Sequence, residues 1–258
     1  MTEFREGTLD TMIERLRCAI SGFDEEWIRN CVSATEQQIQ HLEDICRRYN
    51  YALPEAYRRY LMAMGQNDGG LLEREWDGYC KPNIDYILEL AAEGGGFKDD
   101  LENGLLLFSY HWTDANSYLK LSDGSDNPVV ADMDGKYFAG SFEKYLFQQA
   151  FKMYHETFQY KAGVGNSIKS MDEVLKKHFH PCSAYGGTAE ERMDFAKRLV
   201  EPFHPNKAWF SDDLHYFCYG ETYALTINLH WSFLIVFSCN DPALKEKADR
   251  ELAEIFTV

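Results

Sequence analysis

Long apolar runs, paired cysteines and a basic N-terminal signal are all missing from this 258-residue sequence. The longest purely apolar run is Phe233–Phe237, whereas a membrane-spanning helix needs about 20 apolar residues. The 7 cysteines are scattered and never spaced as Cys-x-x-Cys, which argues against a disulfide framework and a zinc ribbon. A secretory signal would begin with positive charge, but the first residues here include Glu3 and Glu6. We therefore expect a cytoplasmic protein that does not contact membranes.

Proline is also scarce, with 7 residues, and the 18 glycines are no more than usual, while hydrophobic residues make up 45% of the chain and aromatic residues 15%. Disordered, collagen-like and low-complexity proteins have the opposite composition, because they do not pack a core. The composition is typical of a globular protein. A chain of this length suits one large domain or two small ones.

Basic residues are few, and the deficit is concentrated in the first part of the chain. The net charge is −16, with 28 acidic against 15 basic residues up to position 157 and 14 against 11 thereafter. So negative a surface repels nucleic-acid phosphates and attracts basic partners. We expect no nucleic-acid binding. A plainer alternative is that the acidic residues only keep the protein soluble.

Two α+β units are predicted, joined by a polar, glycine-containing linker over 159–166. Capping residues and helix-period stripes predict helices over most of the first 65 residues, including a short one from Trp27 to Val32. Short β-prone segments separated by turns follow, up to a long helix beginning at Ser141. The predicted fold class is α+β, with N-terminal helices, a small antiparallel or mixed sheet of four to six strands and a closing helix over 1–158. A second α+β unit over 159–258 has a three- to four-stranded antiparallel sheet. Its features are a hairpin turn at Gly220-Glu221 and a terminal helix capped by Asp241.

Catalytic and metal-binding motifs are weak. His178, His180 and Cys182 are the most metal-like group, but their spacing matches no known zinc site, so we expect neither metal nor cofactor. His111 and Asp114 lie near a strand end, where an acid or base could act, yet no second convergent group can be identified. The sequence therefore favours a protein without enzymatic activity.

Residues 35–150 resemble the SUKH superfamily, which comprises proteins similar to the fungal cell-wall assembly regulator and bacterial immunity proteins of polymorphic toxin systems. The resemblance begins in the predicted helix with Leu42-Glu43 and continues with Leu53-Pro54-Glu55-Ala56-Tyr57-Arg58-Arg59-Tyr60-Leu61. Asn67 and Gly69-Gly70 follow, with Asp68 inserted between them. Later segments agree in order: Leu106-Leu107-Phe108, Ser117-Tyr118-Leu119-Lys120-Leu121, Pro128-Val129-Val130 and Ser141-Phe142-Glu143-Lys144-Tyr145-Leu146.

The resemblance implies a non-catalytic immunity protein that binds a cognate toxin, often a nuclease, and neutralises it in the bacterial cytoplasm. The acidic charge fits such a partner, because a nuclease needs a basic groove for phosphates. A regulatory protein-binding scaffold, or less favourably an enzyme with a site around His111 and Asp114, is the alternative. The predicted partner-binding residues lie in acidic loops and comprise Glu73, Glu75, Trp76, Asp77, Trp112, Asp114, Asp123 and Asp126.

Overall fold

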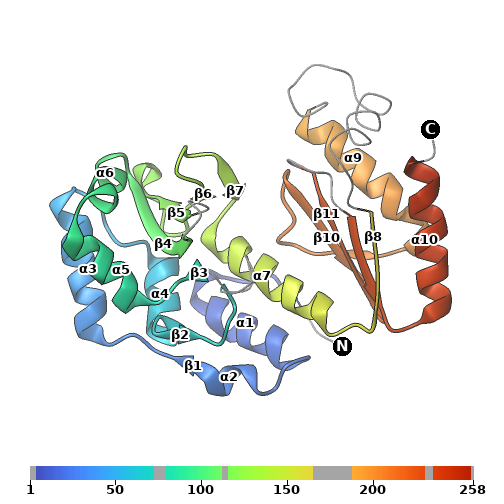
Figure 1. Ribbon diagram of the computed structural model, residues 1–258, viewed down its shortest axis with the longest axis horizontal. Coiled ribbons are helices and arrows are strands. Elements are labelled where there is room, and N and C mark those ends of the chain that lie inside the picture. The colour runs from blue at the N-terminus through green and yellow to red at the C-terminus, as the bar shows by residue number, and fades with distance from the viewer. Residues whose placement is uncertain (1–3, 73–79, 112–115, 165–187, 230–234, 257–258) are drawn as a thin grey trace. The chain divides into compact units, whose positions relative to one another are not determined.

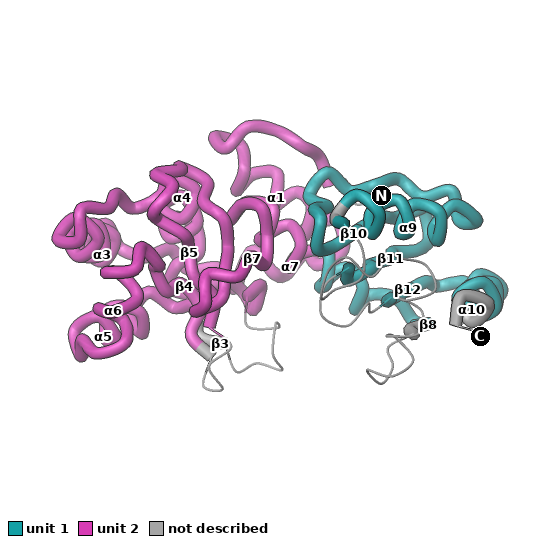
Figure 2. Tube along the Cα trace, turned by 90° about the horizontal axis from the view of Figure 1, so that it is seen from above, with its two compact units in different colours: residues 1, 151–258 teal, residues 2–150 magenta. Residues whose placement is uncertain are grey.

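The structure, a computed structural model, describes residues 4–72, 80–111, 116–164, 188–229 and 235–256. The chain divides into two compact units, an N-terminal unit of residues 2–150 and a C-terminal unit of residues 151–258 (Figure 1, Figure 2). Each unit combines helices with an antiparallel sheet, which confirms the predicted α+β class. None of the described helices is long and apolar enough to cross a membrane.

Most helices of the N-terminal unit precede the strands β4 to β7, as predicted, but the short strands β1 and β2 lie among the first helices and β3 comes before α5 and α6. Short 3-10 turns occur at η1 (Leu9–Thr11) and η3 (Leu121–Asp123). The other elements are α1 (Met12–Ser21), α2 (Trp27–Asn30), β1 (Cys31–Val32), α3 (Glu36–Arg48), α4 (Glu55–Met64), β2 (Asn67–Asp68), β3 (Cys80–Lys81), α5 (Ile84–Glu93), α6 (Gly96–Glu102), β4 (Leu105–His111), β5 (Ser117–Lys120), β6 (Val130–Ala131), β7 (Tyr137–Ala139) and α7 (Phe142–Glu156).

Five of these strands form one antiparallel sheet in the order β3-β4-β5-β6-β7, while β1 and β2 form a separate pair. The order equals the chain order; β4 to β7 are joined by short connections, whereas α5 and α6 lie between β3 and β4. The register pairs Leu106 with Leu119, and an irregularity between Leu107 and Ser109 shifts it at the far end of β4. The strand count agrees with the predicted four to six.

Local sequence signals explain where the helices begin. Thr35 and Gln38 form a capping box, in which each side chain bonds the backbone N–H of the other residue. Asn83 caps α5, and its side-chain oxygen accepts the N–H of Asp85 at 2.8 Å. Ser141 accepts the N–H of Lys144 at 3.1 Å at the start of α7. Because a cap satisfies helix N–H groups that have no intrahelical acceptor, these residues fix the helix starts.

An aromatic cluster forms the centre of the N-terminal core. Phe142 contacts Tyr57, Tyr60 and Phe108 edge-to-face, with ring centroids 5.3–5.6 Å apart, and all four side chains are fully buried. These residues come from α4, β4 and α7. Burying a Phe side chain contributes roughly 1.5–3 kcal/mol, and edge-to-face contacts add to this. The cluster therefore packs α4, β4 and α7 against one another.

The C-terminal unit has a five-stranded antiparallel sheet among its described residues, in the order β8-β12-β11-β10-β9. Buried side chains of this sheet and of the two helices α9 and α10 form one core. Thr188 and Glu191 form a capping box at the start of α9, and Asp241 caps α10 as predicted, accepting the N–H of Ala243 at 2.9 Å. The elements are β8 (Tyr160–Val164), α9 (Ala189–Val200), η4 (Glu201–Phe203), β9 (Asn206–Lys207), β10 (His215–Tyr219), β11 (Tyr223–Asn228), β12 (Ile235–Cys239) and α10 (Pro242–Phe256).

The linker predicted over 159–166 is wrong, because Tyr160–Val164 is strand β8, paired along its length with β12. Glycine and polar residues suggested a loop, but pairing with the apolar strand β12 supplies hydrogen bonds and packing that the local composition does not reveal. With β8 and the short β9, the second sheet has five described strands instead of three or four. The division between the units falls within α7, earlier than the predicted boundary at 158.

Two smaller predictions also differ from the structure. Cys31 and Val32 belong to strand β1, where they pair with β2, and do not continue the preceding helix. Between α5 and α6, the positive φ angles of Gly94 and Gly95 make the turn, and Gly96 begins α6. The β10–β11 hairpin turns at 221–222, because the N–H of Gly220 already bonds the carbonyl of Tyr223.

Candidate functional site

The loop between β5 and β6 carries the two predicted site residues that the structure describes. Asp123 and Asp126 are both exposed. Asp123 lies 3.4 Å from the ammonium group of Lys120, in an exposed ion pair that contributes little to stability. No ion pair of Asp126 occurs within the described residues. Both carboxylates are therefore available to a partner.

Backbone hydrogen bonds hold this loop in one conformation. The N–H of Leu121 donates to the carbonyl of Gly104 at 2.7 Å, and the N–H of Ala56 donates to the carbonyl of Asp126 at 2.8 Å. Gly124 has a φ of 61°, which lets the chain reverse after the 3-10 turn. The loop is thus fixed at both ends, so it can present charge without a large ordering cost on binding.

A groove of about 250 Å³ runs along the loop. Tyr51, Leu53 and Pro54, from the connection between α3 and α4, form one wall, and the β5–β6 loop with Asp126 forms the other. Drug-sized ligands and cofactors usually occupy about 300 Å³ or more. This volume suits a single protruding side chain better than a small molecule.

The remaining predicted residues, Glu73, Glu75, Trp76, Asp77, Trp112 and Asp114, lie outside the described residues. The ends of their segments can be located, because Cys80 pairs with His111 where β3 meets β4. Residue 112 directly follows this pair, whereas Asp123 comes after the opposite end of β5. A four-residue strand spans about 13 Å. The described residues next to the predicted loops therefore lie at opposite ends of the sheet, with Cys80 and His111 at one end and Asp123 beyond the other.

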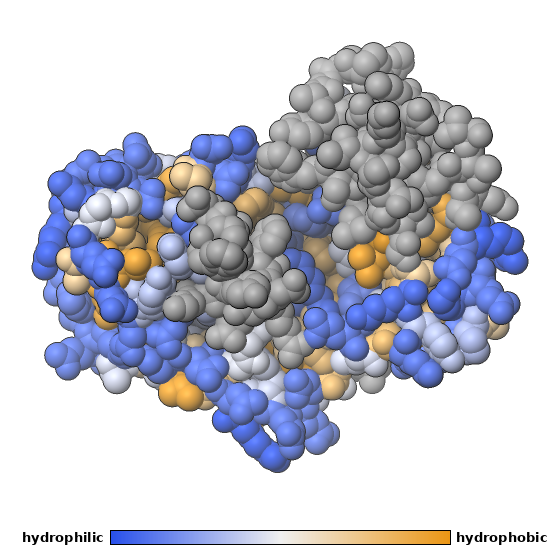
Figure 3. Space-filling model, viewed as in Figure 1, coloured by the Kyte–Doolittle hydropathy of each residue, from blue (hydrophilic) through white to orange (hydrophobic). Residues whose placement is uncertain are grey.

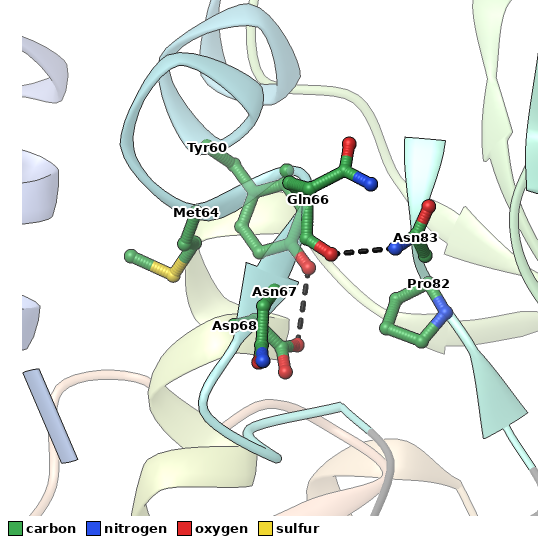
Figure 4. Close-up of a pocket in the computed structure, with 8 residues that line it drawn as sticks. Tyr60, Met64, Gln66, Asn67, Asp68, Pro82 and Asn83 are labelled. Carbon is green, nitrogen blue, oxygen red and sulfur yellow. Dashed lines mark hydrogen bonds between the residues drawn. The ribbon is translucent and has the colours of Figure 1, made fainter. Parts of the chain in front are cut away.

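Asp68, which interrupts the Asn-Gly-Gly pattern, holds the turn after β2 together (Figure 4). Its buried carboxylate accepts the N–H groups of Gly70, Leu71 and Leu72 at 2.9–3.0 Å and the hydroxyl of Tyr60 at 3.0 Å. Hydrogen bonds to a carboxylate are stronger than those between neutral groups. Asp68 thus has a structural role, which the sequence analysis missed.

A small pocket of about 130 Å³ lies beside this turn (Figure 4). Gln66 and Asn83 border it, and the side-chain amide of Asn83 donates to the backbone carbonyl of Gln66 at 2.6 Å. The second Gln66 polar group, its side-chain amide, donates to Asp85. Because the pocket is small and these polar groups bond one another, it resembles a packing defect at a turn more than a ligand site.

Four of the described thiols are poor nucleophiles. Burial raises the pKa of Cys31 to about 11 and that of Cys46 to about 12, and it also raises the pKa values of Cys218 and Cys239. They are therefore protonated at neutral pH. No group of three or more His, Cys, Asp or Glu residues within the described ranges is arranged to hold a metal ion. His178, His180 and Cys182 lie outside those ranges, as does the side chain of His111.

No family model, curated protein or solved structure matches this chain. The functional conclusion therefore depends on the chain's own geometry. One feature that the sequence analysis missed is the acidity of the helices themselves: from Ile84 to Glu102 there are six acidic residues and one lysine. Counting charge along the helices, and not only in the loops, would have found this stretch.

Proposed function

We propose that this protein is a non-catalytic immunity protein of the bacterial cytoplasm, with an N-terminal unit of the SUKH type that binds and neutralises a basic protein toxin. The observation that carries the proposal is the pair of exposed carboxylates, Asp123 and Asp126, on a backbone-fixed loop beside a side-chain-sized groove. A basic toxin residue inserted there would meet carboxylate charge together with the apolar wall of Leu53 and Pro54.

The arrangement of the resembling segments supports this proposal. Residues 55–61 lie in α4, and the three β-type segments lie in or directly beside the neighbouring strands β4, β5 and β6. The Ser-Phe pair at 141–142 begins α7 and brings Phe142 into the aromatic core. Each part of the motif thus has a structural use in one unit, and the same unit carries most of the acidic charge.

Co-expression with the toxin encoded by the neighbouring gene tests the proposal. Asp123→Lys/Asp126→Lys should slow association by about tenfold or more at low salt and flatten its salt dependence, because electrostatic steering acts mainly on the association rate. Cell survival and the association rate at several salt concentrations are the two readouts.

Glu14→Lys/Glu25→Lys is the matched control, because it changes the charge by the same amount at exposed positions elsewhere in the N-terminal unit. The control should retain protection and most of the association rate. Failure of the wild-type protein to protect against or bind the toxin would refute the immunity function. Equal effects of the two double variants would refute the role of the β5–β6 loop.

A further inference from the structure

Helix α5 is incompletely covered by the rest of its unit. Ile84 and Ile87 are buried, whereas Leu88, Leu90 and Ala91 remain partly exposed although the helix is rich in apolar residues. Figure 3 shows apolar atoms among hydrophilic ones over the part of the surface where Figure 1 draws α5. A helix with apolar residues left at the surface is typical of an interaction face.

Unpaired negative charge lies on the same helix. Glu89 and Glu93 are exposed, one helical turn apart, and neither forms an ion pair within the described residues. By contrast, Asp85 accepts the side-chain amide of Gln66. Glu89 and Glu93 therefore flank the partly exposed Leu90 with charge that the unit itself does not neutralise.

A pair of tyrosines adjoins these glutamates. Tyr86 on α5 and Tyr110 on β4 have ring centroids 5.3 Å apart, and both are partly exposed. Because Leu90 and Glu93 follow Tyr86 by four and seven residues, they lie on the same side of the helix. Tyr110 directly precedes His111, the residue next to the predicted loop that contains Trp112 and Asp114. The helix face is thus close to the end of β4 at Tyr110.

We propose that this α5 face, formed by Tyr86, Glu89, Leu90 and Glu93 together with Tyr110, binds a basic amphipathic segment of the partner protein. The segment's apolar side chains pack on Leu90. Its arginines pair with Glu89 and Glu93 and stack on the tyrosine rings, a contact that favours arginine over lysine. A second copy of this chain is a poor occupant, because it would place the same glutamates opposite one another.

The inference deepens the proposed function, on which it rests for the identity of the partner, but the contact chemistry can be tested without the toxin. The probe is a synthetic amphipathic helix of leucine and arginine, about 18 residues long so that it makes about five turns. Its affinity for the full-length protein is measured by fluorescence anisotropy. Glu89→Gln/Glu93→Gln should weaken binding by about tenfold, and Tyr86→Leu should weaken an arginine peptide more than its lysine counterpart.

Glu14→Gln/Glu25→Gln removes the same charge from exposed positions of the same unit and should change the affinity by less than about twofold. Equal weakening by both double variants, or no binding of the peptide to the wild-type protein, would overturn the inference. The two proposals can fail separately. If Glu89→Gln/Glu93→Gln leaves peptide binding unaltered while the wild-type protein protects against the toxin, this face is excluded and the immunity function stands.

Discussion

Acid should destabilise the C-terminal unit through one buried histidine. His155, in the last turn of α7, lies between two hydroxyl groups: its Nδ1 is 2.8 Å from the Ser238 hydroxyl oxygen, and its Nε2 is 2.8 Å from that of Thr226. The imidazole is 6% exposed and packs edge-to-face on Phe151. Burial, with a smaller contribution from Lys161, lowers the pKa of His155 from 6.5 to about 3.

The lowered pKa determines the direction of the effect. Between pH 6.5 and 3 the unfolded chain binds a proton at His155 and the folded chain does not, so the stabilisation is complete above pH 6.5 and is lost as the pH falls. One pKa unit corresponds to about 1.4 kcal/mol, so lowering the pH from 7 to 5 should remove about 2 kcal/mol of unfolding free energy through this residue. Both hydroxyls can rotate to accept hydrogen bonds from a protonated imidazole, so protonation breaks no hydrogen bond. The loss of stability in acid therefore arises from burying the charge of His155.

Urea unfolding at pH 7, 6 and 5 measures this loss. His155→Leu should be less stable at pH 7, because Ser238 and Thr226 lose their partner, but its stability should depend less on pH by about 2 kcal/mol. His204→Asn is the matched control, because His204 is exposed and Asn tolerates its positive φ angle. The same pH dependence in His155→Leu as in the wild type would refute the assignment of this effect to His155.

Three further predictions concern stability. Tyr60→Phe should lower the unfolding free energy by about 1–3 kcal/mol, because Asp68 loses a hydrogen bond. Tyr57→Phe should be neutral or stabilising, because the buried Tyr57 hydroxyl has no partner within the described residues. Equal losses of unfolding free energy in the two variants, measured by urea unfolding, would contradict this contrast. Asp241→Ala should lower the unfolding free energy by about 1 kcal/mol through loss of the cap on Ala243, and an unchanged urea midpoint would mean that the cap contributes nothing. Limited proteolysis should leave β8 uncut, because its backbone is paired with β12; cleavage inside it would contradict the observed sheet.

Sequence patterns predicted those parts of the fold that local interactions determine. The capping box of Thr35, the cap of Asp241 and the order of strands β4 to β7 all follow from residues close together in the chain. Strand β8 was missed because its partner β12 lies some 75 residues further on, and only that pairing makes a polar, glycine-containing segment extended.

The candidate site was predictable only in part, for the same reason. Charge composition indicated acidic loops, and Asp123 and Asp126 are indeed exposed. Composition does not reveal that this loop and His111 lie at opposite ends of the sheet, because their positions follow from the pairing of β3, β4 and β5. The structural use of Asp68 depends on Tyr60, eight residues earlier, reaching the same turn. Likewise, the partial exposure of Leu90 depends on what packs against α5.

The division of the chain inside α7 determines how the two units can be separated for experiments. A fragment that starts at 151 would begin within α7, and one that starts at 159 would begin after it. Phe151 and His155 pack against other residues of the C-terminal unit, so a start at 159 would remove part of that unit's core. Starting at 151 would also leave the first four N–H groups of the truncated helix without their acceptors. An expression fragment of the C-terminal unit should therefore begin at Ser141, retaining the complete helix with its own cap, and the N-terminal fragment should end after Glu156, so that both fragments contain α7.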